Sequence, residues 1–189
     1  MRFISAQSGV IRAWLVVCAL AVCAGQVIYA QSAQALRVVP LVRDSQVLVT
    51  FELKDGFTPD VRAAIHSGLR TSFTYTVDLR RDAFGWLDRT IATATVTNTV
   101  KYDNLKREHA LQQLLDGRVQ KDEIIKDEED VVRTWLTSVI QKPLFPTSIL
   151  QANREYYVRV SASARPSTGS FLWPFGSGAS GRAKFTFIR

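Results

Sequence analysis

The stretch that decides the fold is residues 72–79, which read Ser-Phe-Thr-Tyr-Thr-Val-Asp-Leu. Large apolar side chains alternate there with polar ones. Because the side chains of a β-strand point alternately to the two faces of its sheet, this pattern predicts a strand with one buried and one hydrated face. The threonine, valine and aromatic content also favours a strand. We therefore expect a domain built around a β-sheet that contains this segment.

The same alternation recurs outward along the chain, in residues 47–53, 92–102, 156–163 and 185–187. Two polar pairs, Asp44-Ser45 and Asp116-Gly117, stand between strand-like segments, and Asp-Gly readily adopts the positive φ angles of a tight hairpin. These turns predict further strands at residues 37–43, 110–115 and 118–123. Roughly eight strands joined mostly by short connections indicate an antiparallel arrangement.

Two helices are predicted to interrupt the strands. Thr58-Pro59-Asp60 has the form of a helix N-cap followed by proline at the first helical position, and apolar residues follow at helical spacing. The second helix should begin near Asp127, with acidic residues in its first turn, where the helix dipole favours them. Its apolar stripe is Val132, Trp135, Leu136 and Val139. We expect Pro143 to end this helix.

Residues 1–35 have the three-part pattern of a secretory signal peptide. Arg2 and Arg12 form a basic start, an uncharged apolar run follows to residue 28, and Ala33 and Ala35 occupy the −3 and −1 positions of a signal-peptidase site. An uncleaved N-terminal anchor and lipidation at Cys23 are the alternatives, although Val22 is larger than the residue that usually precedes a lipidated cysteine. We expect an exported protein of the periplasm or cell envelope.

Cleavage after residue 35 would leave a domain of residues 36–189, a length that suits one β-sandwich domain with a real core. Both cysteines, Cys18 and Cys23, lie in the signal segment, so the exported domain would have no disulfide, no cysteine nucleophile and no thiolate metal site. Removing the two arginines of the segment lowers the formal net charge from +7 to +5. These charges are scattered rather than gathered in a stripe, and we expect no nucleic-acid partner.

No motif predicts catalysis, a cofactor or a metal site. His66 and His109 are the only histidines and lie far apart in the sequence, whereas a metal site needs several convergent ligands. The acidic residues 122–130 lack the glycine and the spaced carboxylates of a calcium loop and are explained by solvation and helix capping. No serine lies in a Gly-x-Ser-x-Gly turn. We therefore expect a protein that is not an enzyme, with no cofactor and no bound metal.

The segment from Pro166 to Gly181 is the one compositionally biased part of the chain. Glycine and serine predict a loop, yet it contains four large apolar residues, Phe171, Leu172, Trp173 and Phe175. These side chains either fold back onto the core or form a contact surface for a protein partner or a membrane. They are the candidate binding residues of the sequence.

Several segments resemble an uncharacterised bacterial family of exported domains, known only as a domain of unknown function. The resemblance lies in Gly68-Leu69-Arg70 with Phe73–Arg81, in Lys101–Arg107, in Glu155–Val160 and in Ala183–Phe187. It implies a small secreted or periplasmic protein, often encoded beside a membrane sensor histidine kinase. It implies no activity and no site residue.

Together these observations predict a mainly β protein, an antiparallel two-layer β-sandwich, Ig-like or C2-like, with two short helices on its rim. The expected function is that of an exported, non-enzymatic interaction module, accessory to a membrane sensor kinase. Two alternatives remain open at this stage: a small outer-membrane β-barrel, whose strands also alternate, and a hydrolase of unrecognised type.

The signal pattern makes one direct prediction. The exported protein should begin at Leu36, because Ala33 and Ala35 satisfy the signal-peptidase positions. Intact-mass measurement of the protein from the cell envelope tests this. A measured mass that includes residues 1–35, or one that shows a lipid on Cys23, would contradict it.

Overall fold

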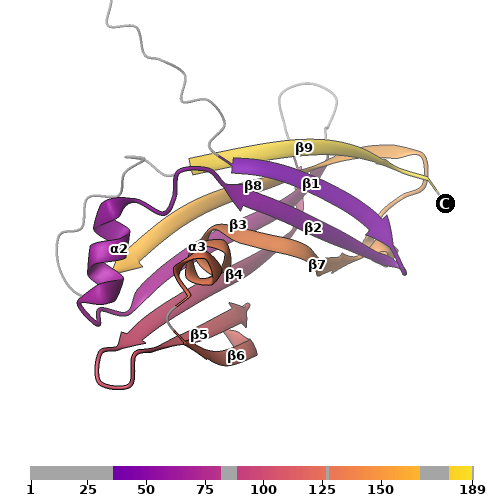
Figure 1. Cartoon of the computed structure of the whole chain (residues 1–189). Helices are drawn as coiled ribbons and strands as arrows, with labels where there is room; N and C mark the ends of the chain where they lie inside the picture. The colour runs from indigo at the N-terminus through magenta and orange to yellow at the C-terminus, as the bar shows by residue number, and fades with distance from the viewer. Residues whose placement is uncertain (1–35, 82–88, 127, 167–178, 189) are drawn as a thin grey trace, which may run out of the picture. The chain divides into compact units, whose positions relative to one another are not determined.

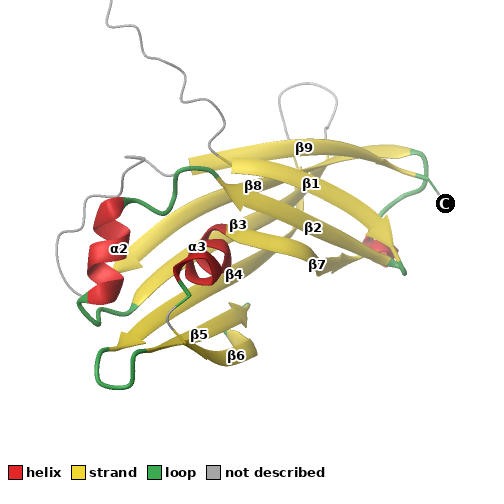
Figure 2. Ribbon diagram, in the orientation of Figure 1, coloured by secondary structure: helices red, strands yellow, loops and turns green. Residues whose placement is uncertain are grey.

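The computed structural model describes residues 36–81, 89–126, 128–166 and 179–188, all within the second of the two units into which the chain divides, Gln34–Arg189. This unit consists of two β-sheets, with two α-helices in its described residues (Figures 1 and 2). The signal segment with Ala33 and Ala35 lies outside the described residues, so its cleavage stays a prediction.

In the described ranges, nine strands form the two sheets. The smaller has the order β1 (Leu36–Arg43), β2 (Gln46–Leu53), β7 (Ser138–Pro146). The larger has the order β6 (Arg118–Lys126), β5 (Glu108–Leu115), β4 (Arg89–Asp103), β3 (Thr71–Arg81), β8 (Arg154–Pro166), β9 (Ala179–Phe187), so that β6 and β9 are its described edges. Every pairing is antiparallel. The predicted two-layer antiparallel sandwich is confirmed.

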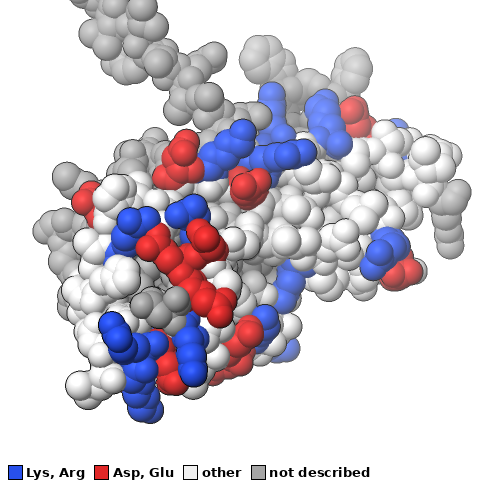
Figure 3. All heavy atoms as spheres, in the orientation of Figure 1, with Lys and Arg blue, Asp and Glu red and all other residues white. Residues whose placement is uncertain are grey.

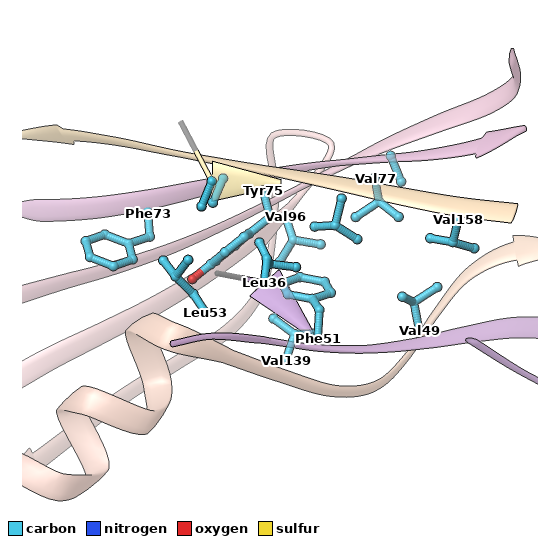
Figure 4. Close-up of a cluster of buried hydrophobic side chains, with 14 of the residues drawn as sticks. Leu36, Val49, Phe51, Leu53, Phe73, Tyr75, Val77, Val96, Val139 and Val158 are labelled. Atoms are coloured by element: carbon cyan, nitrogen blue, oxygen red, sulfur yellow. The ribbon is translucent and has the colours of Figure 1, made fainter. Parts of the chain in front are cut away.

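Strand β3 lies at the centre of the larger sheet, as its sequence predicts. Phe73, Tyr75, Val77 and Leu79 are completely buried, and their polar neighbours lie on the other face. Strand β2 of the smaller sheet contributes Val49, Phe51 and Leu53 to the same core, as the close-up in Figure 4 shows. The rings of Phe51 and Tyr75 are in contact, with their centroids 4.7 Å apart. The core is therefore the space between the two sheets.

The predicted turns and the first helix are also confirmed. Asp44 and Ser45 join β1 to β2, and Asp116 and Gly117 join β5 to β6, all four with positive φ. Helix α2 (Pro59–His66) begins after Thr58, whose hydroxyl accepts a hydrogen bond from the backbone N–H of Val61. Neither α2 nor α3 (Glu129–Thr137) has the length and apolar character that a membrane-spanning helix needs.

The prediction for residues 138–146 is wrong. Helix α3 ends at Thr137, and the chain continues without a loop into β7, so Val139 belongs to a strand and not to the helical stripe. Pro143 lies within β7 instead of ending the helix. A proline is tolerated there because β7 is the edge of its sheet, where a missing backbone N–H need not break a ladder. This strand raises the count from the expected eight to nine.

The two sheets meet directly along β1 and β9. Gly181 in β9 is buried, and a Cβ added to it would lie only 2.0 Å from the carbonyl oxygen of Leu36 in β1. Leu36 is itself buried, with 1% of its surface exposed. Only glycine allows the backbones to approach so closely. On the opposite side, helix α3 lies between β7 of the smaller sheet and β4 and β5 of the larger (Figure 1).

The Gly181 contact predicts a strong effect from one methyl group. Gly181→Ala should destabilise the domain by roughly 1–3 kcal/mol or more, because β1 and β9 must move apart to admit the Cβ. Urea unfolding followed by circular dichroism measures the change. Ser180→Ala, at the exposed neighbouring position, should leave the unfolding midpoint unchanged. An unchanged midpoint for Gly181→Ala would show that this contact is not required.

Candidate functional site

The candidate site is built around the C-terminal end of helix α3. The last carbonyl groups of a helix have no partner within the helix and need external donors. Two buried side chains of the larger sheet supply them: the Tyr75 hydroxyl donates to the Leu136 carbonyl at 2.5 Å, and Asn98 Nδ2 donates to the Trp135 carbonyl at 2.7 Å. Burial raises the pKa of the Tyr75 hydroxyl, which therefore stays protonated as a donor.

From Asn98 a line of hydrogen bonds runs outward to a lysine. Asn98 Oδ1 accepts from Gln113 Nε2 at 2.9 Å, and Gln113 Oε1 accepts from Lys142 Nζ at 2.8 Å. The direction of every bond is fixed, because the Trp135 carbonyl at the inner end can only accept. Asn98 must therefore donate inward and Gln113 must turn its oxygen outward. Position 142 consequently requires a donor.

A β-bulge aims Lys142 at this line. In the pairing of β2 with β7, Val139 lies opposite Phe51 and Lys142 lies opposite Val49, so Thr50 faces two residues, Ile140 and Gln141. The backbone N–H of Gln141 donates to the Thr50 hydroxyl at 3.0 Å. The extra residue changes the alternation, which brings Lys142 to the inner face with Val139. Gln141 adopts a φ of 44°, which costs about 1–2 kcal/mol for a residue other than glycine.

Above this line lies an open groove of about 550 Å³, within the usual size of ligand sites. Helix α3 forms one wall, β7 the second, and β5 with β6 the third. Its lining residues are Gln113, Lys121, Asp130, Val131, Thr134, Trp135, Ser138, Val139, Ile140 and Lys142. Most of the lining surface is apolar. The groove thus combines an apolar wall with a few polar groups at fixed positions.

Trp135 is the largest side chain of the groove and is held on two sides. Its indole N–H donates to the Thr99 carbonyl at 3.3 Å, and Lys121 Nζ lies 5.2 Å from the centroid of its ring. Lys121 also forms an ion pair with Glu123 at 2.6 Å. On the other wall Ile140 is 72% exposed, unusual for a large apolar residue in a strand. Trp135 and Ile140 therefore offer a preformed apolar contact surface.

Lys142 differs from Lys121, the other cation among the lining residues of the groove. Among the described residues, its ammonium has no carboxylate within ion-pair distance, and it donates a hydrogen bond to the neutral Gln113 oxygen. Partial burial lowers the pKa of Lys142, because the charged form loses hydration. Two of its three N–H donors remain available to an anion.

A second cluster joins the two histidines, which the sequence analysis kept apart. The Tyr102 ring lies between them, with centroid distances of 5.6 Å to His66 and 4.5 Å to buried His109. An ion pair between Arg62 and Glu129 links α2 to α3 over an adjoining space of about 10 Å³, too small for a ligand. No three histidine, cysteine or acidic side chains of the described ranges gather closely enough to hold a metal ion.

Charged side chains gather around α2 and α3, whereas the middle of the visible face, over β2 and β7, is mostly uncharged (Figure 3). Around the helices, Arg133 pairs with Glu129 at 3.7 Å and with Asp130 at 3.6 Å. Asp130 is on the rim of the groove and is 94% exposed. The acidic stretch 122–130 is thus paired or solvated at these described positions, as the sequence analysis expected.

The structure does not test the candidate binding residues of the sequence. Phe171, Leu172, Trp173 and Phe175 all lie outside the described residues, and their role stays a prediction. The groove residues Asn98, Gln113 and Lys142 were missed. Asn98 and Gln113 lie opposite each other on β4 and β5, and both point to the inner face of the sheet. In each strand a polar residue thus replaces an apolar one in the inward-facing series, and this is the signal that could have identified them.

The hydrogen-bonded line predicts the behaviour of two substitutions. Asn98→Ala should destabilise the domain by about 1–3 kcal/mol, because the Trp135 carbonyl and the Gln113 amide lose their partner. Asn98→Asp should cost more at neutral pH, since an ionised carboxylate cannot donate to a carbonyl. Burial would raise the pKa of this new carboxyl, so the additional loss should disappear as the pH falls through that raised value toward about 4.

Urea unfolding at pH 7.5 and at pH 5 measures both variants, with Lys101→Ala at an exposed position of the same strand as the control. If Asn98→Ala unfolds at the same urea concentration as the control, the hydrogen bonds of the Asn98 side chain contribute nothing to stability.

The comparisons with known proteins bear on the family alone. The chain matches no curated protein and no solved structure. One family model, described as a domain of unknown function, matches residues 30–168, which include β1 to β8 with the groove. The chain therefore belongs to this family, the domain of unknown function DUF4390.

Proposed function

We propose that this protein is an exported, non-enzymatic interaction module that binds a protein partner in the groove between α3, β7 and β5–β6. The observation that carries the proposal is Lys142, a partly buried ammonium without a carboxylate partner among the described residues, beside an apolar wall. A buried or half-buried charge is costly unless an opposite charge neutralises it. A partner that brings a carboxylate would remove this cost.

The wall of the groove suits a protein partner. Tryptophan is enriched at the centres of protein interfaces, where a rigid aromatic ring fills a desolvated position. Trp135 has this character, because hydrogen bonding and Lys121 hold its ring before any partner arrives. Little conformational entropy then remains to be lost on binding.

A hydrolase is the competing function, and the groove does contain a serine and a lysine. A Ser–Lys pair would require the Ser138 hydroxyl to give its proton to Lys142. Ser138 Oγ instead donates to the Thr134 carbonyl at 2.8 Å, and Lys142 Nζ donates to Gln113. Both side chains thus donate to other acceptors, which argues against their acting as a nucleophile and its base.

The location and the biological setting belong to the same proposal. The signal pattern of residues 1–35 supports export to the periplasm or cell envelope. The resemblance of the chain to exported domains encoded beside sensor histidine kinases supports an accessory role to a membrane sensor. The partner would then be the sensor itself or another envelope protein.

Site-specific photocrosslinking in the host cell tests the groove. A benzoylphenylalanine in place of Ile140, which is 72% exposed on the groove wall, should form an adduct with the partner on irradiation. The same residue at Leu105, 96% exposed in the β4–β5 turn, is the control and should form none. Blotting for the protein measures the shift in mass.

A third position separates the groove from the aromatic segment found in the sequence. If an adduct forms from position 173 and none from position 140, the partner binds through residues 171–175 and the groove proposal fails. Equal labelling from positions 105 and 140 would also contradict it, because such labelling is non-specific.

A further inference from the structure

We propose that Lys142 determines which partner the groove accepts, by binding a carboxylate of an acidic segment whose neighbouring apolar side chain rests on Trp135 and Ile140. This inference rests on the proposed function and adds the chemistry of the partner. It makes Lys142 a specificity-determining residue rather than a structural one.

The shape of β7 limits how a partner can approach. An edge strand ordinarily invites another strand to pair with it. Here the bulge at Ile140 and Gln141 distorts the edge, and Pro143 lacks the backbone N–H that a ladder requires. Recognition must therefore rely on side chains that the groove presents, and the partner need not be an extended strand.

The hydrogen bonds of Lys142 leave it ready for an anion. Gln113 Oε1 holds the ammonium in place at 2.8 Å but carries no full charge. The hydrogen bonds continue from Gln113 through Asn98 to the Trp135 carbonyl. All three of these groups are neutral, so none of them can neutralise the ammonium. The bulge at Ile140 and Gln141 brings Lys142 opposite buried Val49, at a position where a core strand would ordinarily carry an apolar side chain.

The apolar half of the recognition follows from the neighbours of Lys142. Ile140 and Trp135 line the same groove, and neither is fully buried: Ile140 is 72% exposed and Trp135 is half-buried against the core. A short segment with an acidic residue beside a leucine or an aromatic residue satisfies both halves. Asp130 lies on the rim of the groove and is already paired with Arg133, so it would repel a partner carboxylate at the rim. The partner segment should therefore place its acidic residue at Lys142 only.

Titration of the purified protein with 4-phenylbutyrate, which carries one carboxylate and one apolar ring, tests this chemistry. Amide ¹H–¹⁵N shifts at residues 113, 135, 140 and 142 should respond at millimolar concentration. The uncharged analogue 4-phenylbutyramide should bind about tenfold more weakly, as expected for the loss of a charge-assisted hydrogen bond.

Lys142→Gln is the decisive variant, because a glutamine amide can still donate to Gln113 while it removes the charge. It should fold like the original protein and lose the tenfold preference for the carboxylate. Lys101→Gln, on the exposed face of β4, is the matched control and should retain the preference. Equal binding of the acid and the amide by the original protein, no shift in the groove, or an unchanged preference in Lys142→Gln would each overturn the inference.

The same variant separates this inference from the proposed function. In cells, Lys142→Gln should abolish most of the adduct formed from position 140. If that adduct forms undiminished, the groove binds a partner without using the charge, and the inference fails while the proposed function stands. If no adduct forms from position 140 in the original protein, the proposed function fails first.

Discussion

The structure depends on how the C-terminal carbonyls of α3 are satisfied. Tyr75 and Asn98, from neighbouring strands of the larger sheet, donate to the carbonyls of Leu136 and Trp135 at 2.5 and 2.7 Å. A buried helix end without such donors would lose the hydration of its carbonyl groups and gain nothing in return. Because both donors come from completely buried side chains, they fix the helix to the sheet at one position and one angle.

Fixing α3 also fixes the smaller sheet. The chain passes from Thr137 of the helix directly into β7 at Ser138, so no loop can absorb an error in their relative placement. At the other side of the sandwich, Gly181 brings β9 against the backbone of β1. The two layers are thus joined closely at β1 and β9 and held by a helix at β7. The groove lies at the side where the helix is interposed.

Two neighbouring features of β7 are better explained by binding than by folding. The left-handed backbone of Gln141 raises the free energy of the folded state, and the partly buried ammonium of Lys142, whose pKa burial lowers, has no carboxylate partner among the described residues. Replacing a buried polar group with a well-packed apolar one is often neutral or stabilising. Strained backbone and uncompensated charges gather at functional sites, and here both occur within two residues.

The sequence by itself determined the sandwich, because strict alternation in residues 72–79 and 47–53 dictates which side chains are buried whatever the topology. It also determined the turns at Asp44 and Asp116 and the start of α2, since these depend on local backbone chemistry. Strand β7 could not be found in this way, because Pro143 and a bulge disguise its alternation and only the neighbouring β2 supplies its pairing. The groove was likewise decided by tertiary structure alone: Asn98, Gln113 and Lys142 come from three strands of two sheets, and no local pattern specifies that a donor at position 142 meets an acceptor at position 113.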